Sequence, residues 1–187
     1  MEIDTMVASA QEHLETRGLD GWLIYDYRNM NPIFFEALGS ISNITRPCWL
    51  WIPTYGAPAL LVAFVDKGRF ARLGIRTVLF AGRNEMIQRL TELLANTSQI
   101  AMEYSELGEL PRISKVDAGT LELVRNLGIQ VTSSADTLQY ATQRWSLQQL
   151  QSHKVAAGKL GTIVKEAFEY LGKSPASIRT EIEIAQF

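Results

Sequence analysis

Polar side chains gather after the first apolar run of the chain and again before the second. Asp26, Arg28, Asn29 and Asn31 follow the first run, and Arg46 precedes a run that contains two tryptophans. Open α/β sheets bind ligands at the carboxyl ends of their strands, and an arginine can pair with a carboxylate. These five residues are therefore candidates for a substrate or inter-subunit contact. The alternative is that they are turn and cap residues and a surface ion pair.

Other residue types that carry chemistry have no partners at useful spacing. His13 and His153 are the only histidines, and neither has a second metal ligand one helical turn away. Cys48 lies inside an apolar run, which is typical of an inert core thiol. Glu181 and Glu183 are two residues apart, so they lie on different sides of a helix. The sequence predicts no catalytic and no metal-binding residue in this chain.

One segment matches a permissive phosphate-loop pattern. Residues 167–174 read Ala-Phe-Glu-Tyr-Leu-Gly-Lys-Ser. A phosphate loop needs small residues between a strand and a helix, so that backbone N–H groups surround the phosphate. Here the first five residues are bulky and helical, and we interpret the match as a helix terminus. A flavodoxin-like nucleotide binder fits the α/β order but lacks this loop.

Composition limits the class of protein. The chain has 187 residues, a net charge of −2 and a hydrophobic fraction of 47%, which is typical of a globular protein with a core. No basic excess indicates a nucleic-acid surface, and no apolar run approaches the roughly 20 residues that cross a bilayer. The acidic N-terminus lacks a signal-peptide pattern and the single cysteine forms no internal disulfide, so we expect a cytoplasmic location.

The first half of the sequence predicts a helix and a three-stranded start to a sheet. Apolar spacing predicts a helix over 4–17. Asn31-Pro32 is a strong helix start, because Asn caps and Pro takes the first helical position, and Gly39 ends the helix. The predicted strands are 21–26, 47–53 and 58–64, the last two forming a hairpin.

The second half alternates between helices and strands. This order predicts an α/β fold, with a mixed sheet of about six strands and helices on both faces. The predicted helices are 66–73, 84–95 and 117–127, and the predicted strands are 76–80, 99–103 and 129–132. Ser133-Ser134-Ala135-Asp136 is expected to be a strand-to-helix turn with capping hydroxyls.

A long helix is expected to begin after Trp145. Ser146 and Gln149 form a capping box, and apolar residues fall on one face as far as Leu171. We expect a domain over 1–143 and the start of a second over 144–187. Thr180 and Glu183 predict the start of one further helix. Only four residues follow Glu183 in the sequence. The chain therefore reads as the N-terminal part of a larger protein.

Several short motifs together resemble one protein family. They occur along nearly the whole chain, at residues 25–32, 45–47, 52–53, 56–58, 102–105, 116–120, 133–136, 145–146 and 180–181. They are similar to the N-terminal domain of Xaa-Pro dipeptidase-like proteins, of the creatinase/prolidase/aminopeptidase P group of "pita-bread" metallopeptidases. The long helix resembles the lead-in to the catalytic domain of that group.

The resemblance implies an α/β domain without chemistry of its own. In the family, two divalent metals (Mn, Co or Zn) in the C-terminal domain are held by two aspartates, one histidine and two glutamates, and none of those ligand motifs is present here. It also implies a homodimer in which this domain closes over a neighbouring active site that takes short peptides. Arg46 and the 26–31 loop are where we place that contact. The alternative is a stand-alone binding or dimerisation module.

Overall fold

Six strands form one mixed sheet in the computed structural model, which describes residues 3–39, 41, 43–173 and 180–185. The strand order across the sheet is β4-β3-β2-β1-β5-β6. In chain order the strands are β1 (Gly21–Asp26), β2 (Cys48–Pro53), β3 (Ala59–Ala63), β4 (Arg76–Phe80), β5 (Gln99–Met102) and β6 (Gln130–Ser133). The predicted α/β class with a six-stranded mixed sheet is confirmed.

Five of the strands run in the same direction and β2 runs against them. β1 pairs in parallel with β5, β5 with β6, and β3 with β4, whereas β2 is antiparallel to both of its neighbours. Asp26 at the end of β1 lies opposite Cys48 at the start of β2. The carboxyl ends of five strands and the amino end of β2 therefore meet at one edge, which we call the carboxyl edge.

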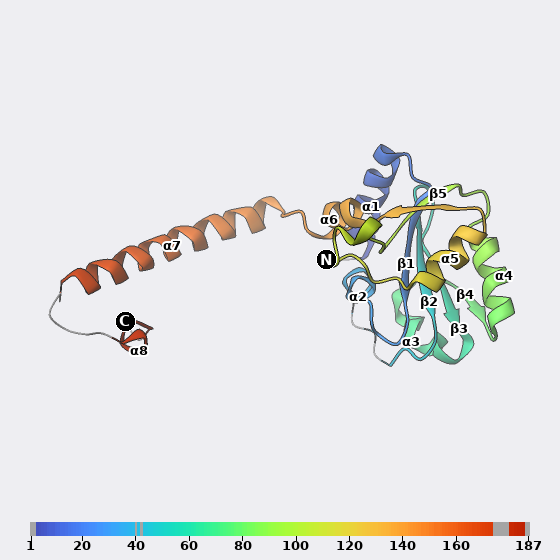
Figure 1. The fold of residues 1–187 in the computed structure, drawn as a ribbon, viewed down its shortest axis with the longest axis horizontal. Helices are drawn as coiled ribbons and strands as arrows, with labels where there is room; N and C mark the ends of the chain where they lie inside the picture. The colour runs from blue at the N-terminus through green and yellow to red at the C-terminus, as the bar shows by residue number, and fades with distance from the viewer. Residues whose placement is uncertain (1–2, 40, 42, 174–179, 186–187) are drawn as a thin grey trace. The chain divides into compact units, whose positions relative to one another are not determined.

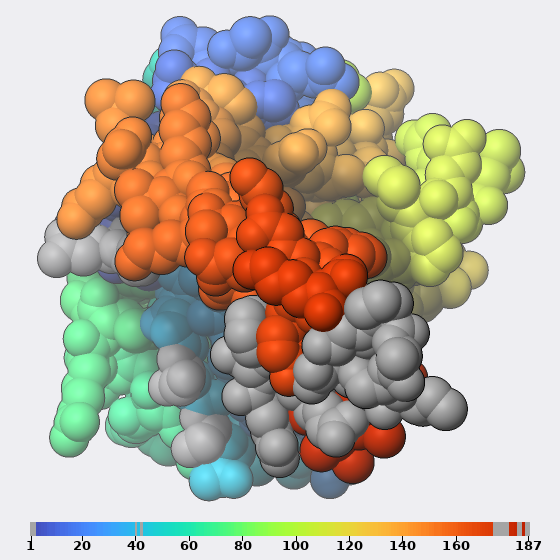
Figure 2. Space-filling view, turned by 90° about the vertical axis from the view of Figure 1, so that its left-hand side faces the viewer, coloured from blue at the N-terminus to red at the C-terminus, as the bar shows by residue number. Residues whose placement is uncertain are grey.

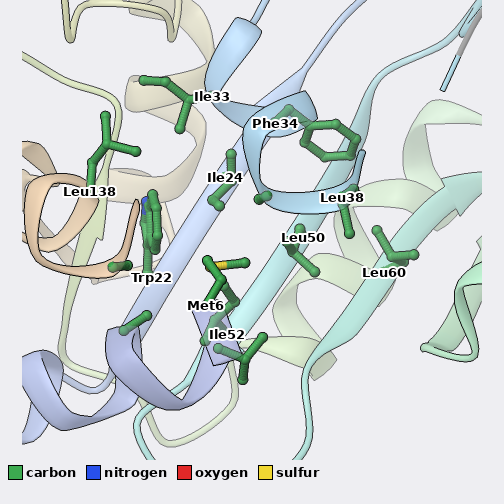
Figure 3. Packing of buried hydrophobic residues seen from close by; sticks show 14 of the residues in the cluster. Met6, Trp22, Ile24, Ile33, Phe34, Leu38, Leu50, Ile52, Leu60 and Leu138 are labelled. Carbon is green, nitrogen blue, oxygen red and sulfur yellow. The ribbon is translucent and has the colours of Figure 1, made fainter. Parts of the chain in front are cut away.

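One face of the sheet is covered by α1 (Ile3–Arg17), α2 (Pro32–Leu38) and α6 (Ala135–Thr142) (Figure 1). Figure 3 shows their side chains against those of the central strands, with Trp22 and Ile24 from β1 beside Leu50 and Ile52 from β2. These are alternate residues, because successive side chains of a strand point to opposite faces. Burial of this apolar surface is the main force that holds the layer together.

The other face is covered by α4 (Arg83–Leu93) and α5 (Ala118–Asn126). It receives the remaining strand residues, including Leu23, Tyr25 and Trp49, which pack against Met86 and Leu90 of α4. Because both faces are covered, the central strands are apolar throughout, as the run at 47–53 indicates.

The segment after β3 differs from the sequence expectation. Instead of one helix over 66–73, the chain forms two 3₁₀ turns, Phe64–Asp66 and Ala71–Leu73, on either side of a single α-helical turn, α3 (Lys67–Phe70). Gly74 ends it with a φ of 67°. Asp66 precedes α3 without a side-chain capping bond, and its carboxylate accepts hydrogen bonds from the loop before β2 instead.

The second unit, Trp145–Phe187, contains the long helix α7 (Leu147–Gly172) and the short helix α8 (Glu181–Ala185). The capping box forms as predicted: Gln149 N donates to Ser146 Oγ at 3.1 Å, and Ser146 N donates to Gln149 Oε1 at 2.7 Å. The Glu183 side chain, predicted to cap α8, lies outside the described side chains. Residues 167–172 of the phosphate-loop match are helical.

The apolar face of α7 is exposed along its length. None of its residues is buried, and Leu147 and Phe168 are 87% and 70% exposed. Figure 2 draws the side chains of α7 in orange to red. No helix in the described part of the chain is long and apolar enough to span a membrane.

Candidate functional site

The carboxyl edge brings together the polar residues that end or precede its strands. Three carboxyl groups are almost fully buried there: Asp26 at the end of β1, Asp66 shortly after β3, and Glu103 immediately after β5. A buried carboxyl is costly unless hydrogen-bond donors surround it. What each of the three binds therefore shows how this edge is built.

Asp26 holds the turn that follows β1. Its Oδ2 accepts a hydrogen bond from Asn29 N at 2.9 Å, and its Oδ1 accepts one from Asn31 N at 2.8 Å. Within this turn Arg28 and Asn29 have φ values of 58° and 61°. Two successive left-handed residues are typical of a type I′ turn, which favours Asn or Gly. Arg28 is therefore held in a conformation that its side chain does not favour.

Two asparagines connect this turn to its surroundings. Asn31 caps α2, since Ile33 N donates to its Oδ1 at 3.0 Å, and its Nδ2 donates to Tyr25 O at 2.7 Å. Asn29 Nδ2 donates to Ile41 O at 2.6 Å, and Asn29 Oδ1 accepts from Ile44 N at 2.8 Å. The 26–31 turn and the loop before β2 are therefore fixed to one another.

Asp66 holds the other end of that loop. Its carboxylate accepts hydrogen bonds from Thr45 N at 2.9 Å, Arg46 N at 3.1 Å and the Thr45 hydroxyl, and Arg69 Nε lies 3.0 Å from Oδ1. Burial opposes ionisation, but these donors outweigh it and hold the pKa of Asp66 below its usual value. The backbone of Arg46 is fixed by this carboxylate.

Glu103 lies deepest and joins four elements. Its Oε1 accepts from the Trp22 indole Nε1–H at 2.7 Å and from the Ser134 hydroxyl at 3.3 Å. Its Oε2 accepts from Tyr25 N and from Asn31 Nδ2, each at 3.2 Å. β1, the α2 cap and the turn into α6 are thereby tied to the end of β5.

The donors around Glu103 differ from those around Asp66 because none that contacts it is a cation. Burial is the largest influence and raises the pKa of Glu103 to about 7, although all four hydrogen bonds favour the charged form. Glu103 therefore changes its charge near neutral pH, whereas Asp66 stays ionised.

The candidate contact residues separate into two groups. Asp26 and Asn31 are buried and act as turn and cap residues, without surface for a direct contact. Arg28, Asn29 and Arg46 line one polar cavity of about 470 Å³ between the two loops. Arg46 makes no ion pair among the described residues, and its Nη1 donates to Thr45 O at 3.2 Å. The loops thus present two exposed guanidinium groups.

Asp66 and Glu103 were not among the residues singled out from the sequence. The sequence pattern places Asp66 at the start of a helix and Glu103 at the end of a strand. The available signal was an acidic residue directly after an apolar run, at the strand end of a sheet buried on both faces. Apart from Arg69, the donors that surround them come from residues 20 to 81 positions away, which periodicity does not identify.

The described residues contain no group of three His, Cys, Asp or Glu side chains that could hold a metal ion. Cys48 is buried, and burial raises its pKa well above the usual value, so the thiol is protonated at neutral pH. His13 packs on Tyr140 with ring centroids 5.0 Å apart, and His153 packs on Trp145 at 4.4 Å.

Comparison with solved structures gives consistent matches. A dipeptidase, PepE, from Mycobacterium ulcerans is 18% identical with a TM-score of 0.62, over 99% of this chain and 47% of that one. A prolidase from Thermococcus sibiricus is 14% identical with a TM-score of 0.61, over 100% of this chain and 48% of that one. The chain thus spans about half the length of these two proteins.

A third match covers a separate domain. The creatinase/prolidase N-terminal domain of an X-Pro dipeptidase from Streptococcus pyogenes is 12% identical with a TM-score of 0.57, over 74% of this chain and 98% of that one. No protein-family model and no curated protein matches the chain. At these identities the likeness concerns the fold, and it confirms the predicted one: the chain has the fold of a creatinase-like N-terminal domain.

Proposed function

We propose that this chain is the non-catalytic N-terminal domain of an Xaa-Pro dipeptidase-like metallohydrolase, contributing to dimerisation and to closure of a neighbouring active site. The observation that carries the proposal is that the fold of the chain and the arginines at its carboxyl edge both suit this role. The fold is that of N-terminal domains in solved dipeptidases and prolidases, and the carboxyl edge presents Arg28 and Arg46 on loops fixed by buried carboxylates.

The proposed contact is electrostatic. A guanidinium group binds a carboxylate through two parallel hydrogen bonds, and a short peptide substrate ends in a carboxylate. Arg46 has a fixed backbone and an exposed side chain, so its guanidinium can reach a second molecule without reordering the loop. Arg28 is kept in a left-handed conformation beside it, and such strain is often retained at functional sites.

The proposed metal ions would be bound by residues outside this chain. Two divalent ions (Mn, Co or Zn) would be held by a catalytic half and would activate water and polarise the peptide carbonyl. The described residues of this chain offer no cluster that fits such ions. The exposed apolar face of α7 suits a helix that would be covered by that half.

The test is a pair of substitutions in the complete protein. Arg46→Ala should lower kcat/KM for Xaa-Pro dipeptides by roughly 10- to 100-fold, which corresponds to one lost charge-assisted hydrogen bond. Arg76→Ala is the matched control, because Arg76 is exposed at the opposite end of β4. Equal kcat/KM and equal dimerisation in both variants would refute the proposed contact.

The second candidate is a stand-alone binding or dimerisation module with the same fold. The coding frame beyond Phe187 decides between the two. An in-frame series of two aspartates, one histidine and two glutamates would exclude the stand-alone module. A stop codon directly after Phe187 would exclude the N-terminal domain of a longer hydrolase.

A further inference from the structure

A second cavity lies at the carboxyl edge, on the face covered by α4 and α5. Its volume of about 500 Å³ is within the range of small-molecule sites. Tyr25, Trp49 and Phe80 form an aromatic wall, with Met86 beside them. The ring centroids of Tyr25 and Trp49 are 5.4 Å apart, and those of Trp49 and Phe80 are 6.2 Å apart. The cavity therefore has an apolar interior built by the sheet.

The opening of the cavity is rich in positive charge. Arg46 and Arg83 both line it. Arg83 is the first residue of α4, where the helix macrodipole disfavours a cation. The residue before it, Gly82, caps the helix without a side-chain hydrogen bond. Helix stability thus gives no reason for Arg83, whereas attraction of an anion does.

Asp117, the acidic residue in the lining, already accepts hydrogen bonds from within the chain. Asp117 caps α5, because its Oδ1 accepts from Thr120 N at 2.9 Å and its Oδ2 accepts from the Thr120 hydroxyl at 2.7 Å. Burial raises the pKa of Tyr25, which keeps its hydroxyl neutral at physiological pH. The charge balance of the lining is two arginines against one aspartate.

Trp49 adds an observation that does not depend on the helix ends. Its side chain is 1% exposed and forms part of the wall. Its indole Nε1–H is buried and has no hydrogen-bond acceptor among the described residues, a state that is rare in folded proteins. By contrast, Trp22 on the opposite face donates to Glu103. The unpaired indole donor thus belongs to a residue that lines the cavity.

We propose that this cavity binds a small organic carboxylate with an apolar body. The aromatic wall takes the body, and Arg83 and Arg46 attract the carboxylate at the opening. This site goes beyond the proposed function, because it is complete within one copy of the chain and requires neither a catalytic half nor a dimer.

The test is NMR of the 187-residue chain, which has four tryptophans and hence four indole N–H signals. Trp49→Phe assigns the Trp49 signal. Titration with 3-phenylpropionate should move that signal in a saturable way and leave the Trp22 signal in place. Two comparison probes separate the contributions of the apolar body and the charge. 3-Phenylpropan-1-ol keeps the apolar body without the charge, and acetate keeps the charge without the body. Both should bind at least about tenfold more weakly.

Arg83→Gln is the decisive variant, because Arg83 has no part in the proposed dimer contact. It should raise the Kd for 3-phenylpropionate by about tenfold, the effect of losing one charged hydrogen-bond donor. Arg76→Gln makes the same charge change on β4 at the far edge and should leave the Kd unchanged. The proposal would be overturned if the alcohol bound as tightly as 3-phenylpropionate, or if the two variants had equal Kd values. It would also be overturned if inorganic phosphate bound and 3-phenylpropionate did not. None of these results depends on peptidase activity.

Discussion

The carboxyl edge has two layers that differ in charge and in exposure. The inner layer consists of the buried carboxyl groups of Asp26, Asp66 and Glu103, and the outer layer consists of the exposed side chains of Arg28, Arg46 and Arg83. The inner groups accept hydrogen bonds from surrounding donors. Arg28 and Arg46 project from the loops that Asp26 and Asp66 fix, and Arg83 begins α4. Under the proposed functions of the three arginines, stability and recognition depend on different residues of one edge. Substitutions in the two layers should therefore have different consequences.

The largest effect is expected at Glu103. Its pKa is raised from 4.5 to about 7, so its contribution to stability is fully present below about pH 4.5 and is lost as the pH rises through 7. The side chain in Glu103→Gln stays neutral. The unfolding free energy of this variant, relative to that of the native chain, should therefore rise by about 3 kcal/mol between pH 4.5 and pH 8. Urea unfolding at several pH values measures this difference. A difference that does not vary with pH would show that Glu103 does not titrate in this window.

Asp66 should respond to pH in the opposite direction. Its pKa is lowered, so its contribution is present above the ordinary value of 3.8 and is lost as the pH falls through the folded-state pKa. Asp66→Asn removes the charge beside Arg69 and places a donor against backbone N–H groups. We expect a loss of about 2 kcal/mol at pH 7, which diminishes towards pH 3. If Asp66→Asn is equally destabilising at both pH values, the inner layer does not depend on this charge.

Arg28 offers a gain of stability in the outer layer. Its φ of 58° is unfavourable for any residue except glycine and, to a lesser degree, asparagine or aspartate. Arg28→Gly should stabilise the chain by about 0.5–1 kcal/mol, while Arg28→Ala keeps the strain and serves as the control. Thermal unfolding of the two variants gives the comparison. A loss of stability in Arg28→Gly would indicate that the guanidinium supports the fold.

The smallest effect is expected at Arg46. Arg46→Gln removes an exposed guanidinium that donates to the neighbouring carbonyl of Thr45, and the unfolding free energy of this variant should stay within about 0.5 kcal/mol of the native value. If Arg46→Gln lowered the unfolding free energy as much as Asp66→Asn does, the distinction between the two layers would not hold.

The sequence predicted the parts of this edge that depend on local chemistry. Asn31-Pro32 indicates a cap because the capping bond joins residues only two apart, and the bonds between Ser146 and Gln149 join residues three apart. The central strands are recognisable because they are apolar on both faces. Arg28 and Arg46 line one cavity because β1 and β2 are neighbours in the sheet, an order that the sequence does not provide.

The inner layer could not be predicted from the sequence. Glu103 binds Trp22, which is 81 residues away, and Asp66 binds Thr45, which is 21 residues away. Only the strand order places these pairs together, and hydrophobic periodicity does not give that order. The same limit applies to the cavity of Trp49 and Arg83, whose walls come from β1, β2, β4 and two helices.

Our central proposal is that this chain supports an active site that lies outside it. Its most direct test is hydrolysis of Xaa-Pro dipeptides by the purified 187-residue chain, with Mn²⁺ or Co²⁺ added and proline release measured. We predict no release above the metal-only blank at any chain concentration. Metal-dependent release that rises in proportion to the chain and is lost on its unfolding would contradict the claim.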